Sequence, residues 1–207
     1  YSKYHSRAMM QYLKNIGHFF ETHLWRFWYG RPDVAMRIYG VTGTNGKTTT
    51  SYLLTSILEH AHGKEKVGML TTVSFRVAGV DEMNTSKMTT LPSRKVFGYL
   101  SRMKKVGVKD VVLETTSHAL HQYRLAGIRF DGAIILNIAR EHLDYHKTMK
   151  RYAAAKEKIV ALLKKNAPLV GKQSDDIVRA MLDRAEKRGV RVVRMTDDSI
   201  EQTTTAL

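Results

Sequence analysis

The run Gly40-Val41-Thr42-Gly43-Thr44-Asn45-Gly46-Lys47-Thr48-Thr49-Thr50 contains three glycines at three-residue intervals, followed by a lysine and three threonines. It follows a short apolar segment, Met36–Tyr39, and precedes residues 51–58, whose pattern is typical of a helix. A strand, a glycine-rich turn and the start of a helix form the setting of a phosphate-binding loop. Glycines let backbone N–H groups close around phosphate oxygens, and the N-terminus of the helix adds partial positive charge.

Two side chains of this run suit the chemistry of a bound nucleotide. Lys47 can reach the terminal phosphates, and the Thr48 hydroxyl can bind Mg²⁺. The spacing departs from the common Gly-x4-Gly-Lys-Ser/Thr form, because Val41 stands where that form has its first glycine. The alternative is a glycine-rich turn with an exposed lysine. We favour phosphate binding, since the glycines, Lys47 and Thr48 all fall in register.

Composition narrows the range of functions. The chain has 207 residues, 43% of them hydrophobic, which suits one domain with an appendage. It has no cysteine, which excludes disulfides and thiolate metal sites. The net charge of +15 favours polyanionic partners such as nucleotides. Because the basic residues are spread along the chain, we do not expect specific nucleic-acid binding. With no evident secretory signal, we expect a cytoplasmic protein, with membrane association left open by its first residues.

Residues 1–30 carry apolar side chains at three- and four-residue steps, which predicts an amphipathic helix. The apolar stripe consists of Met9, Tyr12, Leu13, Ile16, Phe19, Phe20, Leu24, Phe27 and Trp28. In one interpretation the stripe packs on the following domain or on a missing neighbour; in the other the helix makes peripheral contact with a membrane. We favour the first, because Gly17 and Glu21 interrupt the stripe. The predicted division is a helical segment with a linker, residues 1–34, and a domain, residues 35–207.

From residue 36 onward, strand and helix patterns alternate. Strands are predicted at Met36–Val41, Lys66–Thr71, Val73–Val77, Asp110–Leu113, Ala133–Asn137 and Val190–Val193. Helices are predicted at Lys47–Glu59, Pro92–Val106, Ser117–Leu125, Met149–Lys164 and Asp175–Arg188. Such alternation predicts an α/β fold of the P-loop type, with a mostly parallel sheet and helices on both faces. The N-terminal amphipathic helix precedes this unit.

An acidic residue, Glu114, stands at the carboxyl end of the apolar strand pattern that begins at Asp110. In open α/β sheets, ligands sit at the carboxyl edge of the strands. A carboxylate there can hold Mg²⁺, directly or through water. The alternative is a glutamate that caps the following helix.

A third segment, Leu136–His146, again follows an apolar strand pattern. His142 and His146 are four residues apart and would share one face of a helix, as pairs of zinc ligands do. The segment lacks the glutamate of a metalloprotease motif, and no third histidine or cysteine ligand is evident. We therefore favour a structural or substrate-facing role for His146. Ten residues later comes Lys156, which taken alone is an ordinary helix lysine.

Together these segments resemble the central ATPase domain of the Mur ligases. Members of the branch that adds the third amino acid show a GVTGTNGKTTT loop, a Glu-x-Ser-Ser-His-Ala-Leu segment and an Asp-His-Leu-Asp-Tyr-His stretch followed by Tyr-x-x-Ala-Lys. Here these are residues 40–50, 114–120, and 141–146 with 152–156. The combination is specific to that family, whereas the loop alone would also suit cyanophycin synthetases and folate ligases. Two departures are mild: Glu141 replaces the usual aspartate, and Thr115 and Thr116 replace small residues and serine.

The resemblance implies a role for each matching position. ATP would be bound by Gly43, Thr44, Asn45, Gly46, Lys47, Thr48, Thr49 and Asn137. Mg²⁺ would be bound by Thr48 and Glu114, and a second Mg²⁺ by His142 and by Lys156, which family members carbamoylate with CO2. Lys47, His142 and Lys156 would be the catalytic residues. The UDP-muramoyl substrate would be contacted by Thr89, Thr90, Thr116, Gln122 and Arg124.

The activity implied by the resemblance is ATP-dependent amide formation in peptidoglycan synthesis. The carboxylate of a UDP-N-acetylmuramoyl-peptide would attack the γ-phosphate of ATP to give an acyl phosphate, which the incoming amino acid then displaces. Family members are about twice as long and have three domains, of which the first and third are missing here. The alternative function is a nucleotide-dependent binding module at the membrane or the cell-wall machinery, without ligase activity of its own.

Overall fold

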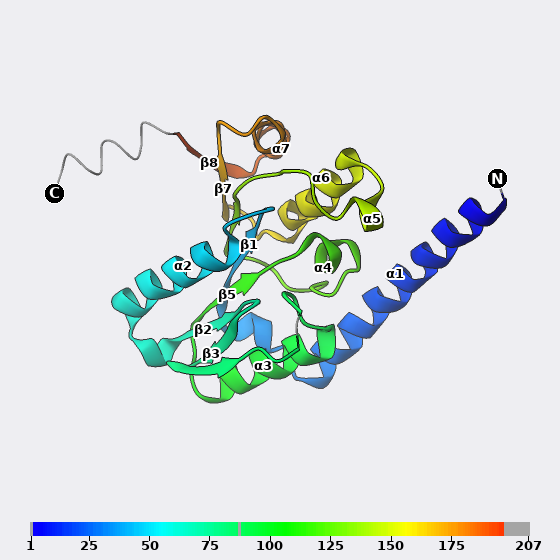
Figure 1. The fold of residues 1–207 in the computed structure, drawn as a ribbon. Coiled ribbons are helices and arrows are strands. Elements are labelled where there is room, and N and C mark those ends of the chain that lie inside the picture. Colours follow the sequence, from blue (N-terminus) through cyan, green and yellow to red (C-terminus); the bar gives the residue numbers. More distant parts are fainter. Residues whose placement is uncertain (1, 87, 197–207) are drawn as a thin grey trace.

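β1 (Arg37–Thr42) lies near the middle of a sheet that has eight strands within the described residues, 2–86 and 88–196, of this computed structural model (Figure 1). The strand order is β4-β3-β2-β5-β1-β6-β7-β8. The other strands are β2 (Val67–Leu70), β3 (Ser74–Val77), β4 (Val80–Met83), β5 (Asp110–Glu114), β6 (Gly132–Ile135), β7 (Pro168–Lys172) and β8 (Arg191–Met195). Neighbouring strands are parallel except in the pairs β2–β3 and β3–β4, which are antiparallel. The mostly parallel sheet is as predicted.

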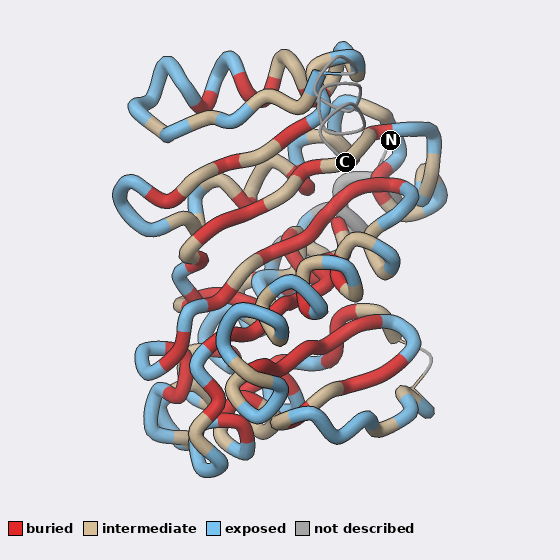
Figure 2. Tube along the Cα trace, turned by 90° about the vertical axis from the view of Figure 1, so that its left-hand side faces the viewer, coloured by how far each residue is buried: buried red, intermediate tan, exposed pale blue. Residues whose placement is uncertain are grey.

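Helices cover both faces of the sheet, which confirms the predicted α/β architecture. Adjacent residues of a strand point to opposite faces, so Val111 and Val112 of β5 belong to different clusters. Val112 lies in the smaller cluster, on which α2 (Lys47–His62) packs. Val111 lies in the larger core, to which three further helices contribute: α3 (Ser93–Lys105), α6 (Met149–Glu157) and α7 (Asp176–Lys187). Figure 2 shows the buried positions running along the strands between these layers.

Apart from the N-terminal helix, the remaining helices of the described residues are short and lie in the connections between these elements. They are η1 (Pro32–Ala35), η2 (Lys64–Lys66), α4 (Ser117–His121), α5 (Leu143–His146) and η3 (Lys158–Leu162). α4 starts just after β5, and α5 lies in the long connection from β6 to α6. The loops that follow β1, β5 and β6 therefore meet at one edge of the sheet, because these three strands are parallel neighbours.

α1 (Ser2–Trp28) is the predicted N-terminal helix, and part of it lies along α3 (Figure 1). Its Thr22 hydroxyl is buried 2.6 Å from the Ser93 hydroxyl at the start of α3. The predicted apolar stripe, however, is not what packs there, because Leu13, Phe20 and Leu24 are all exposed. The expectation that the stripe packs on the following domain is therefore wrong for most of its described side chains, although the Phe19 ring lies 5.8 Å from the Tyr123 ring. Packing on a missing neighbour stays a prediction, and the side chains of residues 2–8 and 12 lie outside the description. No described helix is long and apolar enough to cross a bilayer.

Two strands, β4 and β7, were not predicted. β4 is an edge strand with two acidic residues and little burial, so it lacks a strand pattern. β7 begins at Pro168 and contains Gly171, both poor strand formers except at strand starts or close approaches. Gly171 is such an approach, since an added Cβ would lie 2.9 Å from the Leu182 side chain.

Two predicted helices end early in the structure. The helix expected at Met149–Lys164 is α-helical to Glu157 and continues as η3, because backbone groups of Leu162 and Lys164 bond Phe130 instead. The helix expected at Ser117–Leu125 ends at His121, shortly before Tyr123, whose φ of 55° is left-handed. The end of the predicted domain, residues 197–207, lies outside the described residues.

Candidate functional site

The loop between β1 and α2 is joined by hydrogen bonds to the segment that follows β6. The Thr44 amide donates to the Asn137 carbonyl at 2.8 Å, and the Asn45 amide donates to Asn137 Oδ1 at 2.8 Å. In return the Asn137 side-chain amide donates to the Asn45 carbonyl at 3.1 Å. The Thr44 hydroxyl accepts from the Ala139 amide at 2.9 Å and lies 3.1 Å from the Tyr152 hydroxyl. The loop conformation is thus fixed by neighbouring protein groups.

Two glycines of the loop meet different demands. Gly46 is the N-cap of α2 with a φ of 80°, in the left-handed region where glycine is favoured. At Gly43 the demand is space, since an added Cβ would lie 2.9 Å from the Leu136 Cβ. The first turn of α2 carries Lys47, whose Nζ donates to the Thr44 carbonyl at 2.7 Å. The lysine therefore folds back over its own loop, beside the amide groups that could hold phosphate.

Glu114, at the end of β5, is buried and accepts three hydrogen bonds. The Thr48 hydroxyl donates to Oε2 at 3.0 Å and the Thr72 amide to the same oxygen at 2.9 Å. The Thr72 hydroxyl donates to Oε1 at 3.1 Å. The predicted pair Thr48 and Glu114 is thus in direct contact, and Glu114 does not cap the next helix, whose N-cap is Thr116.

Lys156 reaches the same loop from α6. It is almost fully buried, and its Nζ donates to the Gly43 carbonyl at 2.6 Å and lies 4.8 Å from the centre of the Tyr152 ring. Burial, with the nearby charge of Lys47, lowers the pKa of Lys156 to about 7. An amine with such a pKa is partly unprotonated at neutral pH, unlike an ordinary surface lysine.

The two histidines predicted on one helix face occupy different settings. His142 precedes α5 with a φ of 54°, and its ring lies 4.8 Å from that of His118 and 6.2 Å from that of Tyr152. His146 is buried, and its Nε2 lies 2.9 Å from the Ser117 hydroxyl. Burial, with the nearby histidines, lowers the pKa of His146 to about 4, so the ring is neutral at pH 7. These contacts fit the structural role expected for His146.

The predicted substrate residues form one connected group beside Glu114. The Thr90 hydroxyl donates to the Glu114 carbonyl at 3.1 Å and lies 3.2 Å from the Thr116 hydroxyl. Arg124 donates to the Thr90 carbonyl at 2.9 Å and, through Nε, to Gln122 Oε1 at 2.9 Å. The Thr89 hydroxyl lies 2.9 Å from the Thr72 hydroxyl, which connects this group to the Glu114 carboxylate.

The donors at the loop fit one magnesium ion. Mg²⁺ prefers oxygen ligands and is commonly held by one or two carboxylates together with phosphate and water. Thr48 and Glu114 offer a hydroxyl and a buried carboxylate in contact with one another. Within the described residues, no group of three or more His, Asp or Glu side chains could hold a metal by itself. A metal at this site would therefore need further oxygen ligands from a phosphate or water.

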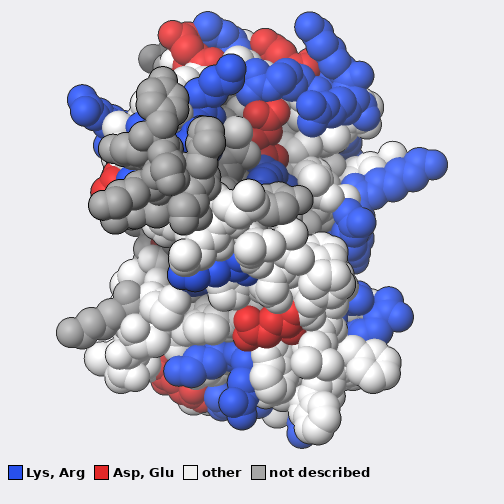
Figure 3. All heavy atoms as spheres, turned by 90° about the vertical axis from the view of Figure 1, so that its right-hand side faces the viewer, with Lys and Arg blue, Asp and Glu red and all other residues white. Residues whose placement is uncertain are grey.

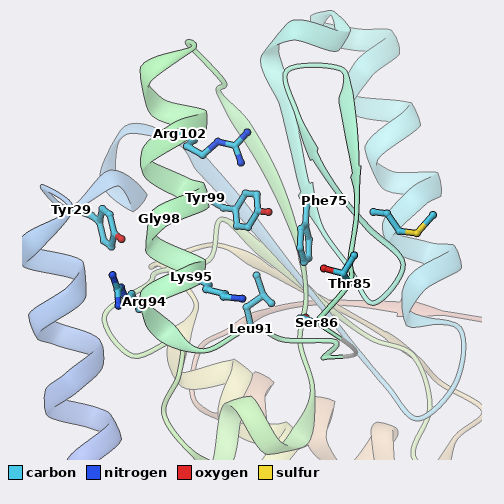
Figure 4. Close-up of a pocket in the computed structure, with 11 residues that line it drawn as sticks. Tyr29, Phe75, Thr85, Ser86, Leu91, Arg94, Lys95, Gly98, Tyr99 and Arg102 are labelled. Atoms are coloured by element: carbon cyan, nitrogen blue, oxygen red, sulfur yellow. The ribbon is translucent and has the colours of Figure 1, made fainter.

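A cleft of about 490 Å³ lies elsewhere, between α3 and the β3–β4 hairpin (Figure 4). Phe75 of β3 and Tyr99 of α3 both line the cleft and pack on one another, with ring centres 4.8 Å apart. None of the predicted nucleotide-binding residues lines it. The cleft adjoins the substrate group through Leu91, which follows Thr90 directly.

Sequence reasoning missed two residues of this site. Thr72 gives Glu114 two of its three hydrogen bonds, and it follows β2 at the same edge of the sheet as the loop. Its position after a parallel strand was the available signal. Tyr152 contacts Thr44, Glu141 and Lys156, and burial raises its pKa to about 12. The sequence pattern placed Tyr152 four residues before Lys156, but not its contact with the loop.

Comparison with curated proteins gives related ligases. The chain is 40% identical over 131 residues to the UDP-N-acetylmuramoyl-L-alanyl-D-glutamate--2,6-diaminopimelate ligase of Aquifex aeolicus, covering 63% of this chain and 26% of that protein. The ligase of the same name from Bacillus cereus is 39% identical over 137 residues, covering 66% and 27%. The chain thus spans about a quarter of the length of these relatives.

Solved structures show the same fold. A UDP-N-acetylmuramoyl-L-alanyl-D-glutamate--2,6-diaminopimelate ligase matches with a TM-score of 0.65 and 29% identity, covering 77% of this chain and 31% of that one. MurF from Acinetobacter baumannii matches with a TM-score of 0.61 and 17% identity, covering 88% and 35%. Folylpolyglutamate synthase of Mycobacterium tuberculosis, solved with ADP, matches with a TM-score of 0.68 and 15% identity, covering 85% and 46%. The last two likenesses concern the fold alone.

The family model described as the Mur ligase middle domain matches residues 41–206. This range contains the loop from Val41 onward, Glu114, the histidine segment and Lys156, in the order that the resemblance required. The match covers most of the chain and agrees with the relatives and with the fold. The chain therefore belongs to the Mur ligase middle domain family.

Proposed function

We propose that this chain is the Mg-ATP-binding part of a ligase that joins an amino acid to a UDP-N-acetylmuramoyl-peptide in the cytoplasm. The observation that supports it best is the contact of Thr48 with the buried Glu114 carboxylate, beside Lys47 on the same turn of α2. A nucleotide's phosphates and their Mg²⁺ need an amide-lined loop, a lysine, a hydroxyl and a carboxylate in this arrangement. We propose the complete ligation reaction only for a longer assembly, because the chain spans about a quarter of the length of its relatives.

The loop residues would act mainly by position. The amides of residues 43–49 bind phosphate oxygens, and Lys47 leaves the Thr44 carbonyl to neutralise the terminal phosphates. Asn137 keeps the loop in shape through its two side-chain hydrogen bonds with Asn45. Thr48 and Glu114 would be the protein ligands of Mg²⁺, which would neutralise charge on the phosphates. ATP supplies the phosphoryl group that activates the substrate carboxylate.

Lys156 would provide a second anionic ligand after modification. Its Nζ, with a pKa lowered to about 7, is unprotonated often enough to attack the carbon of CO2. The product is a carbamate, and one proton is released. The carbamate replaces a cation with an anion beside the phosphates and, with His142, suits a second Mg²⁺. The proposal is supported by the proximity of both residues to Tyr152, because the His142 ring and Lys156 Nζ lie 6.2 Å and 4.8 Å from the centre of its ring.

The substrate would lie along the group formed by Thr89, Thr90, Thr116, Gln122 and Arg124. Among the described residues, the hydrogen-bond partners of the Arg124 guanidinium are neutral oxygens of Thr90 and Gln122. Its charge is therefore left for an anionic group, which a UDP-muramoyl-peptide carries. We propose residues 35–207 as the catalytic unit and residues 1–34 as a separate helical element.

The test is calorimetric titration of the chain with Mg-ATP. We expect binding that weakens by roughly tenfold or more in Lys47→Ala, because that lysine is the cation next to the phosphates. Lys187→Ala, at an exposed position of α7, is the matched control and should bind as the parent does. Equal binding by both variants would contradict the assignment of this loop. Mg-ATP binding without amide formation, after addition of the missing domains, would favour the binding-module alternative.

A further inference from the structure

α1 contacts the domain mainly through its polar side, although Trp25 packs on the larger core and the Phe19 ring lies 5.8 Å from the Tyr123 ring. Asn15 and Thr22 are buried, and Gln11 Nε2 donates to the Tyr145 hydroxyl at 3.5 Å. At 100° per residue, positions 11, 15, 18, 22, 26 and 29 lie within about 40° of one line along the helix. This line includes Arg26, whose ion pair with Asp33 at 2.8 Å fixes the end of the helix. The polar side of α1 therefore faces the domain. In most amphipathic helices the polar side faces solvent.

The opposite side of α1 is apolar and exposed. It comprises Met9, Met10, Leu13, Phe20, Leu24, Phe27 and Trp28. Leu13, Phe20 and Leu24 lie within about 20° of the direction opposite to Thr22. Phe27 and Trp28 are 77% and 75% exposed, although they are large aromatic residues. Single exposed apolar residues are ordinary, but a row of seven along one side of a helix, interrupted at Gly17 and bordered by Glu21, marks a binding surface.

The charged residues near the stripe indicate which kind of surface it could bind. α1 carries the basic residues Lys3, Arg7 and Lys14 and the acidic residue Glu21, besides Arg26, whose charge is paired with Asp33 on the packed side. Arg31 follows the helix, and Lys104 Nζ reaches the Gly30 carbonyl at 3.4 Å. On the face shown in Figure 3, Lys and Arg cover more of the surface than Asp and Glu. The net charge of the chain is +15.

We propose that the exposed stripe of α1 lies on an anionic membrane surface, with the domain held on the other side of the helix. An apolar face with aromatic anchors and basic residues around it is the design of interfacial helices. A helix of 27 residues is about 40 Å long, which gives this surface a large contact along the bilayer plane. Lys and Arg near the surface add attraction to anionic headgroups.

The same charges disfavour the other occupants of the stripe. Two copies of α1 packed stripe against stripe would bring their basic residues together, without acidic partners on α1 beyond Glu21. Another segment of a longer chain could cover the stripe only if it carried acidic residues opposite the basic residues beside the stripe. An anionic bilayer satisfies both the apolar stripe and its basic surroundings.

The experiment is co-sedimentation of the full 207-residue chain with vesicles. Vesicles of phosphatidylcholine with about one-third phosphatidylglycerol should bind the chain, and pure phosphatidylcholine vesicles should bind roughly tenfold less. Phe20→Glu combined with Leu24→Glu should reduce binding to the anionic vesicles roughly tenfold or more, because charge enters the apolar stripe. Ile57→Glu is the matched control, since Ile57 is equally exposed on α2, and it should bind as the parent does.

Tryptophan fluorescence gives a second readout that does not depend on the charge of the variants. Trp28 is exposed and should shift to shorter wavelength on anionic vesicles, and the shift should be lost in Trp28→Phe. Unchanged thermal melting of the double variant would show that it is folded, as expected for exposed positions. Absence of vesicle binding, equal binding by the double variant, or a dimer in light scattering that this variant dissociates would each overturn the proposal.

Discussion

The Thr48 hydroxyl donates to the Glu114 carboxylate at 3.0 Å, which joins the first turn of α2 to the end of β5. The two residues are 66 positions apart, and they meet because β1 and β5 are parallel neighbours whose carboxyl ends share one edge of the sheet. The contact places a buried anion beside a loop that carries Lys47. A buried carboxylate with only neutral hydrogen-bond donors costs desolvation energy, which a bound cation would offset.

We predict that Glu114→Gln makes nucleotide binding independent of magnesium. The amide keeps the size of the side chain and one acceptor oxygen, but it removes the charge that would hold the ion. Affinity for Mg-ATP should fall roughly tenfold or more, while affinity for ATP in excess chelator should stay as in the parent. Calorimetry with and without Mg²⁺ measures both.

The matched control for Glu114→Gln is Glu82→Gln. Glu82 lies on the edge strand β4, is paired with Arg102, and lies away from the loop. This control should leave the magnesium dependence intact. If Glu114→Gln retained the full effect of magnesium, the ion would have to be held elsewhere.

We predict that Gly43→Ala destabilises the chain, although alanine is a small residue. The new Cβ would lie 2.9 Å from the Leu136 Cβ, closer than such atoms approach, so the loop or β6 must shift. We expect a loss of about 1–3 kcal/mol in the free energy of unfolding, measured with urea. Gly17→Ala is the control, because nothing lies within 4 Å of its added Cβ on α1. Alanine there should stabilise by up to about 1 kcal/mol, and an equal loss at both sites would contradict the steric argument.

Much of the fold could be predicted because the apolar patterns of most segments match the strands and helices that these segments form. Strands β1, β5 and β6 are short apolar runs followed by turn residues, and their order identifies a parallel sheet. β4 could not be predicted, since it is a strand only through its pairing with β3. The side that α1 packs could not be predicted either. The apolar stripe normally packs, and here hydrogen bonds to Thr22 hold the helix in the opposite orientation.

The candidate site was predictable at the level of motifs, and its contacts were not. The position of Glu114 at the end of a strand pattern identifies it as a site residue. That position does not indicate which residues bond to it. Thr72 comes from a different strand, and its two hydrogen bonds to Glu114 depend on the register of β2 against β5. The burial of Lys156 is also a tertiary effect, because a lysine in this position of α6 is an ordinary helix lysine by sequence alone.

We predict that His146 makes the fold sensitive to mild acid. The pKa of His146 is lowered to about 4 in the folded chain, from an ordinary value near 6.5. As pH falls from about 6.5 to 4, the unfolded chain binds the proton first, so the free energy of unfolding decreases. We expect His146→Gln to remove roughly 1–3 kcal/mol of this decrease. Urea unfolding at a series of pH values measures it.

The control for His146→Gln is His60→Gln, at an exposed position of α2. The acid-induced loss of stability should be as large in this variant as in the parent. If His146→Gln lost stability with acid as steeply as the parent, another group would have to be responsible.

We predict that Lys156 makes the free energy of unfolding rise with pH. A surface lysine in an ion pair has the opposite effect. Burial, with the charge of Lys47, lowers the pKa of Lys156 to about 7, from 10.5 in the unfolded chain. Between pH 7 and 10.5 the unfolded chain therefore binds more protons at this site, and this group makes stability rise with pH. Lys156→Met lacks a titrating amine. Its free energy of unfolding relative to that of the parent should therefore be highest at pH 7 and below.

This prediction is measured as the difference in unfolding free energy between Lys156→Met and the parent, in degassed buffers that exclude CO2. The difference should change by roughly 3–5 kcal/mol between pH 7 and 10, an upper bound that local relaxation reduces. Lys150→Met, exposed on the same helix, should show no such change. Addition of bicarbonate to the parent should weaken its pH dependence, because a carbamate at Nζ no longer takes up the proton. A pH-independent difference for Lys156→Met would mean that Lys156 keeps its proton in the folded chain, and the amine would then be unavailable to CO2.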